Sequence, residues 1–191
     1  MIPEQFHLVA FDAGVIAGVA ERVASIVGLP ADLEVRVEVD ETSPLGRNRL
    51  VAVPGPGGQA SDAGPVTIAI QSGALEDAKR PRQLREASVG GVLSRLLFRA
   101  GDRLDPAFGD PPGEADLSLA QGVAWDAYSV GRGVRHGIED SEPRWRYHFR
   151  NRHGFTDVAD AAFDRLWSAS GLTWADIEAT CAETEAARQP A

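Results

Sequence analysis

The stretch that decides the fold is Leu33-Glu34-Val35-Arg36-Val37-Glu38-Val39-Asp40, in which apolar and charged side chains alternate. Successive side chains of a strand point to opposite faces, so this alternation predicts a strand with one face buried. Two shorter apolar runs follow at residues 50–53 and 66–70. The second is rich in β-branched residues and is expected to be a central strand. Glycine and proline between them, at residues 55–65, predict a mobile loop.

Helical patterns surround these strands. Asp12 can cap a helix over residues 13–27, where valines recur at helical spacing before Gly28. Further helices are predicted over residues 83–104, 118–136, 157–169 and 173–188. Capping boxes at Ser118 and Thr173 open the helices at 118–136 and 173–188. One helix, then strands, then mostly helices predicts an α+β fold, with a small mixed or antiparallel sheet packed by helices and a C-terminal helical hairpin. We divide the chain into a core at residues 1–137 and an extension at residues 138–191.

Composition restricts the class of protein. The chain has 191 residues, a net charge of -9 and one cysteine, Cys181. A single cysteine excludes an internal disulfide and a multi-cysteine metal site, and it favours a cytoplasmic location. No apolar run reaches the roughly 18 residues that a membrane span needs. The acidic balance disfavours generic nucleic-acid binding. Lys79 is the only lysine among many arginines, which is typical of a GC-rich bacterial genome.

Positive charge is concentrated in Arg144-Trp145-Arg146-Tyr147-His148-Phe149-Arg150. The alternation predicts a strand, with the aromatic side chains on a buried face and the basic ones on the other. Arginine can bind carboxylate or phosphate through two parallel hydrogen bonds, so this face is a candidate site for an anionic ligand or a partner protein. The candidate ligand-binding residues are Arg144, Arg146, His148, Arg150, Arg152 and His153. The alternative is structural: the arginines would pair with Glu139, Asp140 and Glu142, or with the acidic last helix.

No complete catalytic motif is present. The metalloprotease motif His-Glu-x-x-His and the serine-hydrolase motif Gly-x-Ser-x-Gly are both absent. Cys181 lies in an acidic predicted helix, where neighbouring carboxylates disfavour a thiolate. We therefore assign no catalytic residue, no cofactor and no metal, and we expect the protein to purify without stoichiometric zinc. The enzyme alternative is a hydrolase that uses His148 or His153 with a nearby carboxylate.

The helices predicted at residues 157–187 outline a helix-turn-helix, with Gly171 in the turn. A DNA-binding protein is therefore a further alternative. The second of these helices carries Asp176, Glu178, Glu183 and Glu185, which phosphates would repel. A helical hairpin packed on the core is the preferred interpretation.

The order of the elements from about residue 10 to about residue 136 resembles the minimal zincin metallopeptidase scaffold: a helix, strands such as residues 33–39 and 66–70, a long helix and another helix. In that family the long helix carries His-Glu-x-x-His. Here the corresponding frame falls near Gly90-Gly91-Val92-Leu93-Ser94, without ligands or general base. The resemblance thus implies a zincin-like fold without zinc or protease activity. The leading hypothesis is a non-catalytic bacterial cytoplasmic protein that binds a partner or an anionic ligand.

Overall fold

The computed structural model describes residues 1–55 and 64–188, so most of the loop predicted at residues 55–65 lies outside the described residues. The chain divides into two compact units, residues 1–104 and residues 105–191. The boundary predicted from the sequence was later, at residue 137. The boundary is earlier because helix α3 (Leu119–Arg135) packs against the three helices that follow it and so belongs to the second unit.

The first unit contains a small mixed sheet, which confirms the predicted class. Strand β3 (Val66–Gln71) lies between β1 (Val35–Asp40), to which it is parallel, and β2 (Asn48–Ala52), to which it is antiparallel. The alternation that predicted β1 is seen in its burial, since Val37 and Val39 are buried and Asp40 is exposed. Strand β3 is central, as expected, and buries Val66, Ile68 and Ile70.

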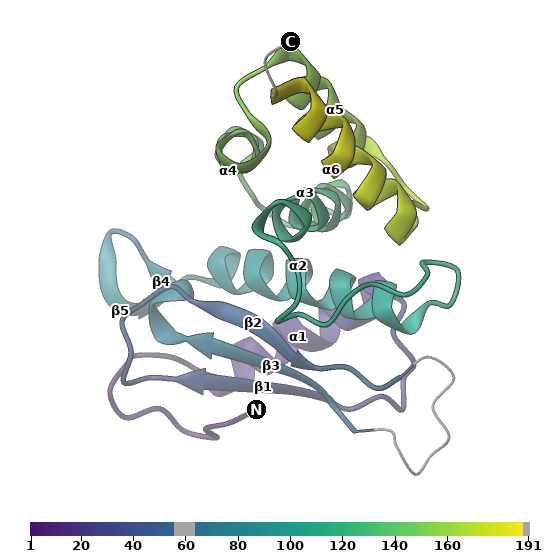
Figure 1. Cartoon of the computed structure of the whole chain (residues 1–191). Coiled ribbons are helices and arrows are strands. Elements are labelled where there is room, and N and C mark those ends of the chain that lie inside the picture. The colour runs from purple at the N-terminus through teal and green to yellow at the C-terminus, as the bar shows by residue number, and fades with distance from the viewer. Residues whose placement is uncertain (56–63, 189–191) are drawn as a thin grey trace. The chain divides into compact units, whose positions relative to one another are not determined.

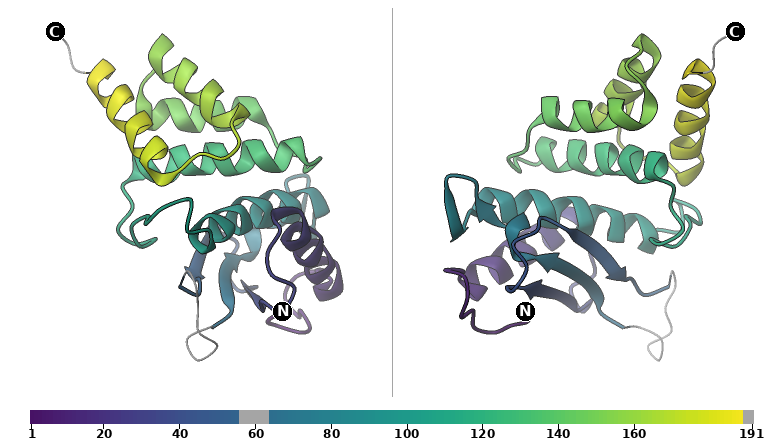
Figure 2. Two further views of the ribbon diagram at one scale, coloured as in Figure 1. Left: turned by 90° about the vertical axis from the view of Figure 1, so that its right-hand side faces the viewer. Right: turned by 60° about the vertical axis from the view of Figure 1, so that its left-hand side comes forward.

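Helices α1 (Ala13–Val27) and α2 (Glu86–Leu104) lie side by side on one face of this sheet (Figures 1 and 2). Asp12 caps α1 as predicted, because its carboxylate accepts hydrogen bonds from the backbone N–H groups of Gly14 and Val15 at 2.7 and 3.2 Å. Gly28 ends the helix with φ of 79°, a left-handed conformation that glycine adopts without steric cost. Apolar side chains of α1 turned to the core include Ile16, Val19 and Val23.

A short hairpin between β3 and α2 was not predicted. The polar segment after residue 71 forms a 3-10 turn (Ser72–Ala74) and two paired strands, β4 (Glu76–Asp77) and β5 (Arg80–Leu84). Side chains hold it in place. The Arg82 guanidinium donates to the backbone carbonyls of Leu8 at 2.9 Å and Glu41 at 3.0 Å. Residues 76–84 are mostly polar, so they lack the alternation of apolar and polar side chains that would predict strands.

The second unit is a bundle of helices. Ser118 and Gln121 form the predicted capping box of α3, and Thr173 and Asp176 exchange hydrogen bonds at the start of the last helix. The other helices are α4 (Glu142–His153), α5 (Asp157–Ser168) and α6 (Trp174–Arg188), of which the last two form the predicted C-terminal pair. The core of the unit includes Trp125, Tyr128, Phe149, Phe163 and Trp174. No helix among the described residues has the length and apolar character to cross a bilayer.

The strand predicted at residues 144–150 is wrong, because this segment lies within helix α4. Local signals for the helix are present: Ser141 accepts a hydrogen bond from the N–H of Arg144, proline stands in the first turn, and arginines stand in the last turn. Burial follows a helical period and not an alternation. Phe149 and His153, four residues apart, are buried, whereas Tyr147 is 58 % exposed. The three aromatic residues therefore do not share one buried face.

Candidate functional site

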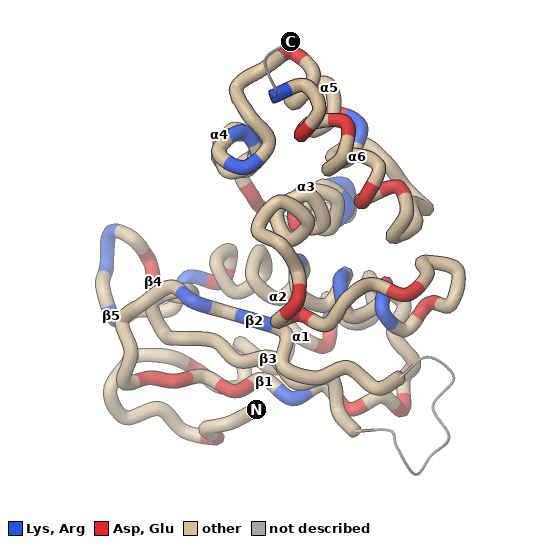
Figure 3. Tube along the Cα trace, viewed as in Figure 1, with Lys and Arg blue, Asp and Glu red and all other residues tan. Residues whose placement is uncertain are grey.

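Helix α4 brings the six candidate residues onto one element, but it turns them to different surroundings. Basic residues gather on α4, and acidic residues lie along the neighbouring helices α5 and α6 (Figure 3). Three of the candidate arginines are in ion pairs. Arg144 contacts Asp140 at 2.7 Å, Arg146 contacts both Glu142 and Asp164, and Arg150 binds Asp160.

The pair of Arg150 and Asp160 has the most ordered geometry. The Nε and Nη2 atoms of Arg150 donate to the two carboxylate oxygens of Asp160 at 2.7 and 2.6 Å. This bidentate contact stabilises the charged carboxylate, so the hydrogen bond from Arg150 lowers the pKa of Asp160. Arg150 and Arg146 thus fasten α4 to α5. Of the alternatives drawn from the sequence, the structural pairing is seen with Asp140 and Glu142, and the remaining partners come from α5 and not from the last helix.

We expect charge reversal in the double variant Arg146→Glu/Arg150→Glu to lower the melting temperature of the helical unit. The change places new carboxylates beside Asp160 and Asp164, so attraction between α4 and α5 becomes repulsion. Thermal melts followed by circular dichroism measure the effect. Arg144→Glu is the matched control, because its partner Asp140 precedes α4 and no second helix is involved. An equal drop in melting temperature in both proteins would show that the ion pairs between α4 and α5 contribute no more to stability than the pair of Arg144 and Asp140.

His153 is buried and its side chain makes contacts within the core of the helical unit. Its side chain is 1 % exposed, and its ring stacks on Phe149 with 3.9 Å between the ring centres. Nδ1 lies 2.7 Å from the Thr184 hydroxyl, and Nε2 lies 3.1 Å from the carbonyl oxygen of Ala120. A carbonyl can only accept, so Nε2 carries the proton and the neutral ring has both nitrogens satisfied. Burial lowers the pKa of His153.

We expect the helical unit to lose stability as the pH falls below about 6.5, the unperturbed histidine value. The folded state holds the pKa of His153 below that value. Between the folded pKa and the unfolded pKa, the unfolded chain therefore binds more protons than the folded chain. The contribution is therefore complete above about pH 6.5 and is lost progressively below it. Denaturant melts at about pH 7.5 and about pH 5 measure this difference.

The controls for this pH effect are His153→Gln, which should remove the dependence, and His148→Gln at an exposed position, which should retain it. Carboxylates such as Asp160, whose pKa is lowered, titrate at more acidic pH and do not contribute in this window. A pH dependence that persists unchanged in His153→Gln would assign the effect to another group.

The exposed part of α4 is aromatic and basic. Arg144, His148 and Arg152 are exposed and recur every four residues, so they form one stripe on the helix. Beside the stripe, the rings of Tyr147 and Phe155 meet edge to face with centres 6.1 Å apart, and His148 lies 6.5 Å from Tyr147. Phe155 is 65 % exposed. We call these five residues the α4 surface.

Phe155 was missed in the sequence, because it follows the segment in which basic and aromatic residues alternate. It lies beyond the end of α4, after Gly154, so neither the alternation nor a helical period in the sequence would have pointed to it. The Arg144 guanidinium lies 5.5 Å from the ring centre of Trp145, a distance at which a cation is attracted to an indole. The α4 surface therefore combines large apolar area with positive charge.

Metal-ligating side chains, the Cys181 thiol and His153 are the groups on which the catalytic alternatives depend. Among residues 1–55 and 64–188, no three histidine, cysteine or acidic side chains lie close enough together to hold a metal ion. Burial, together with Glu178, raises the pKa of the Cys181 thiol to about 11, so a thiolate is scarce at neutral pH. The sequence-based argument invoked neighbouring carboxylates alone, whereas burial is the larger cause in the structure. The ring nitrogens of His153 are engaged with Thr184 and Ala120.

Comparison of the chain with protein-family models, with curated proteins and with solved structures gives no significant match. The zincin-like order of elements stays a prediction.

Proposed function

We propose that this chain is a non-catalytic binding protein, which engages a partner protein through the α4 surface. The observation that carries the proposal is the exposed ring pair of Tyr147 and Phe155, 58 % and 65 % accessible, beside a stripe of basic side chains. The bacterial and cytoplasmic setting of this proposal comes from the arginine and cysteine usage alone.

Aromatic side chains support a protein partner over a small anion. Tyrosine and arginine are enriched among the residues that contribute most to binding energy at interfaces, and each aromatic ring buries a large area at low entropic cost. By contrast, Arg146 and Arg150 are already neutralised by carboxylates of α4 and α5. A free anion would have to compete with those carboxylates, whereas a protein surface can cover the rings of Tyr147 and Phe155 without breaking any pair.

Charge indicates the kind of partner. His148 and Arg152 give the α4 surface a local positive character in a chain whose net charge is -9, whereas the charge of Arg144 is paired with Asp140. Electrostatic complementarity then favours a partner whose contact face is apolar at its centre and acidic at its rim. Nucleic acid would meet repulsion from the acidic residues on the neighbouring helices α5 and α6 (Figure 3).

The double variant Tyr147→Ala/Phe155→Ala tests the proposal. Both side chains are mostly exposed, so the free energy of unfolding should change by only about 0.5 kcal/mol or less per site. Binding of an acidic partner protein, isolated with the unaltered chain and then purified, should fall at least about tenfold, which corresponds to about 1.4 kcal/mol. Titration calorimetry measures the affinity.

Leu45→Ala is the matched control, because Leu45 is a large apolar side chain that is 52 % exposed in the other unit. It should leave the affinity unchanged. Charge reversal at Arg152 should weaken binding in a salt-dependent way, since exposed charges are screened over about 8 Å at physiological ionic strength. Equal binding by the aromatic double variant and the unaltered chain would overturn the proposal.

A further inference from the structure

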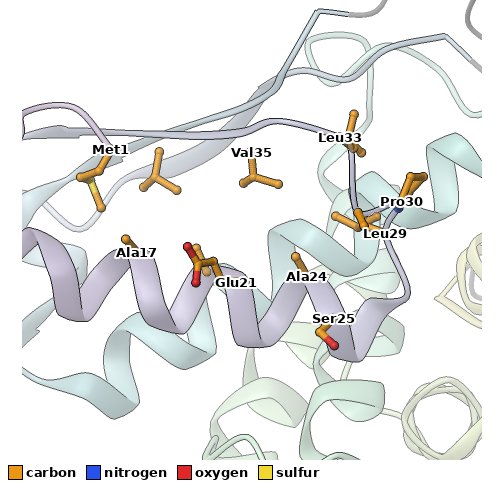
Figure 4. Close-up of a pocket in the computed structure, with 12 residues that line it drawn as sticks. Met1, Ala17, Glu21, Ala24, Ser25, Leu29, Pro30, Leu33 and Val35 are labelled. Atoms are coloured by element: carbon orange, nitrogen blue, oxygen red, sulfur yellow. The ribbon is translucent and has the colours of Figure 1, made fainter.

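A groove in the first unit is separate from the α4 surface. It has a volume of about 440 Å³ and runs between helix α1 and strand β1, with the 29–33 segment at one end and Met1 at the other (Figure 4). Its walls are mainly apolar, and Val35 and Ala24 face each other across it. All of its lining residues belong to residues 1–37, so it lies within a single compact unit.

The groove exists because the side of α1 that faces β1 carries small side chains. Ala17, Ala20 and Ala24 recur at i, i+3 and i+7, which places them on one face of the helix. Opposite them, Val35 and Val37 are short as well. Two facing surfaces of small side chains on a helix and a strand do not fill the space between their backbones. The result is an open apolar cavity where larger side chains would have formed core.

The mouth of the groove lies along a sheet edge, where backbone N–H and C=O groups can form hydrogen bonds with an added strand. Strand β1 is the outer strand of its sheet. The N–H of Val66 bonds to the carbonyl of Glu34 on the inner side of β1, so the odd-numbered residues of β1 turn their N–H and C=O groups outward. At Val37 and Val39 those groups bond to Ile2, at 2.9 and 2.8 Å. No such bond is recorded at Val35 among the residues that the structure describes.

Ile2 shows that this edge accepts an added strand, because it pairs with Glu38 in parallel from a segment that is otherwise irregular. One step along the edge, Val35 therefore has both an unpaired backbone and an apolar cavity beside it. Adding a strand to such an edge is a known mode of peptide recognition: main-chain hydrogen bonds supply affinity and adjoining pockets supply specificity. A small hydrocarbon ligand would use the cavity but not the backbone groups.

Charge selects among peptides. Glu21 projects at the groove from α1, between Ala17 and Ala24 (Figure 4). It is exposed, and no ion pair of Glu21 is recorded in the described part of the chain. Glu21 is the one acidic side chain among the residues that line the groove. A basic side chain on the incoming segment would be attracted to this carboxylate, and an acidic side chain would be repelled.

We propose that the groove between α1 and β1 binds an extended peptide segment of another protein, which adds as a strand beside Val35. The segment places an apolar side chain between Val35 and Ala24 and a basic side chain near Glu21. This site is distinct from the α4 surface, and neither proposal depends on the other.

A blocked pentapeptide with valine and lysine two positions apart, so that both side chains point to the α1 side of an added strand, is the probe, titrated into the full chain labelled with nitrogen-15. Amide resonances of Val35 and Val37 should shift on titration, and an otherwise identical peptide with glutamate in place of the lysine should bind more weakly. A valine–lysine peptide with N-methylated backbone should lose most of its affinity, because it cannot make the edge hydrogen bonds. Dodecylamine tests whether an apolar amine suffices without a peptide backbone.

Matched variants locate the site. Ala24→Leu fills the groove and should weaken binding at least about tenfold, whereas Ala187→Leu, at an exposed position of α6, should not. Glu21→Gln should weaken binding of the lysine peptide about two- to fivefold, and Glu178→Gln should have no effect. If Ala24→Leu does not fold, Ala17→Leu fills the other part of the groove. The proposal is overturned if Val35 does not respond, if the N-methylated peptide binds equally well, or if only dodecylamine binds.

Discussion

Replacement of Phe149 by alanine is expected to lower the free energy of unfolding of the helical unit by about 3–5 kcal/mol. The ring is 0 % exposed, stacks on His153 at 3.9 Å and meets Phe163 edge to face at 5.7 Å. Truncation removes all of these contacts, and the surrounding helices cannot close the cavity without moving α4. The loss includes the stacking partner of a buried histidine, whose ring would then border an empty space.

Denaturant unfolding followed by the helical circular dichroism signal measures this change. Tyr147→Ala is the internal control, because it removes a ring of similar size from the same helix at a position that is 58 % exposed. We expect it to change stability by about 0.5 kcal/mol or less. Similar losses in the two variants would contradict the assignment of the buried face of α4, and an unchanged midpoint in Phe149→Ala would contradict the helix itself.

Gly131→Ala is expected to destabilise the same unit by about 1–3 kcal/mol, although alanine is the better helix former. A β-carbon at Gly131 would lie 2.2 Å from the backbone carbonyl oxygen of Trp167, so α3 and α5 would have to separate. That carbonyl also accepts a hydrogen bond from Arg135, which would be disturbed by the same movement. The clash is with backbone, which cannot rotate away as a side chain can.

Gly122→Ala in the same helix is the matched control, for which we expect the free energy of unfolding to rise and not to fall. Nothing lies within 4 Å of a β-carbon at Gly122, so alanine should stabilise by about 0.5–1 kcal/mol by restricting the unfolded chain and favouring the helix. Denaturant midpoints of the two variants measure the contrast. Stabilisation by both substitutions would show that α3 and α5 do not cross as closely as the structure indicates.

Local sequence patterns correctly predicted those parts of the fold for which a pattern has a single interpretation. Strand β1 was found because alternation over eight residues fits no helix, and α1 and α3 were found because Asp12 and Ser118 cap them through bonds that span only two or three residues. The α+β class and a small sheet followed from these elements, whereas the structure decided that the sheet is mixed and not antiparallel. For the candidate site, the sequence located the right segment: all six named residues lie on α4 or at its last residue.

Only the tertiary structure decided what those six residues do. The segment at residues 144–150 predicted a strand because basic and aromatic residues alternate along it. The same residues also allow a helix, whose buried stripe passes through Phe149 and His153. The choice depends on partners distant in sequence: Asp160 and Asp164 on α5 for the arginines, and Thr184 on α6 for the histidine. Burial and ion pairing act through space, and a pattern within one segment does not encode which carboxylates its arginines will meet.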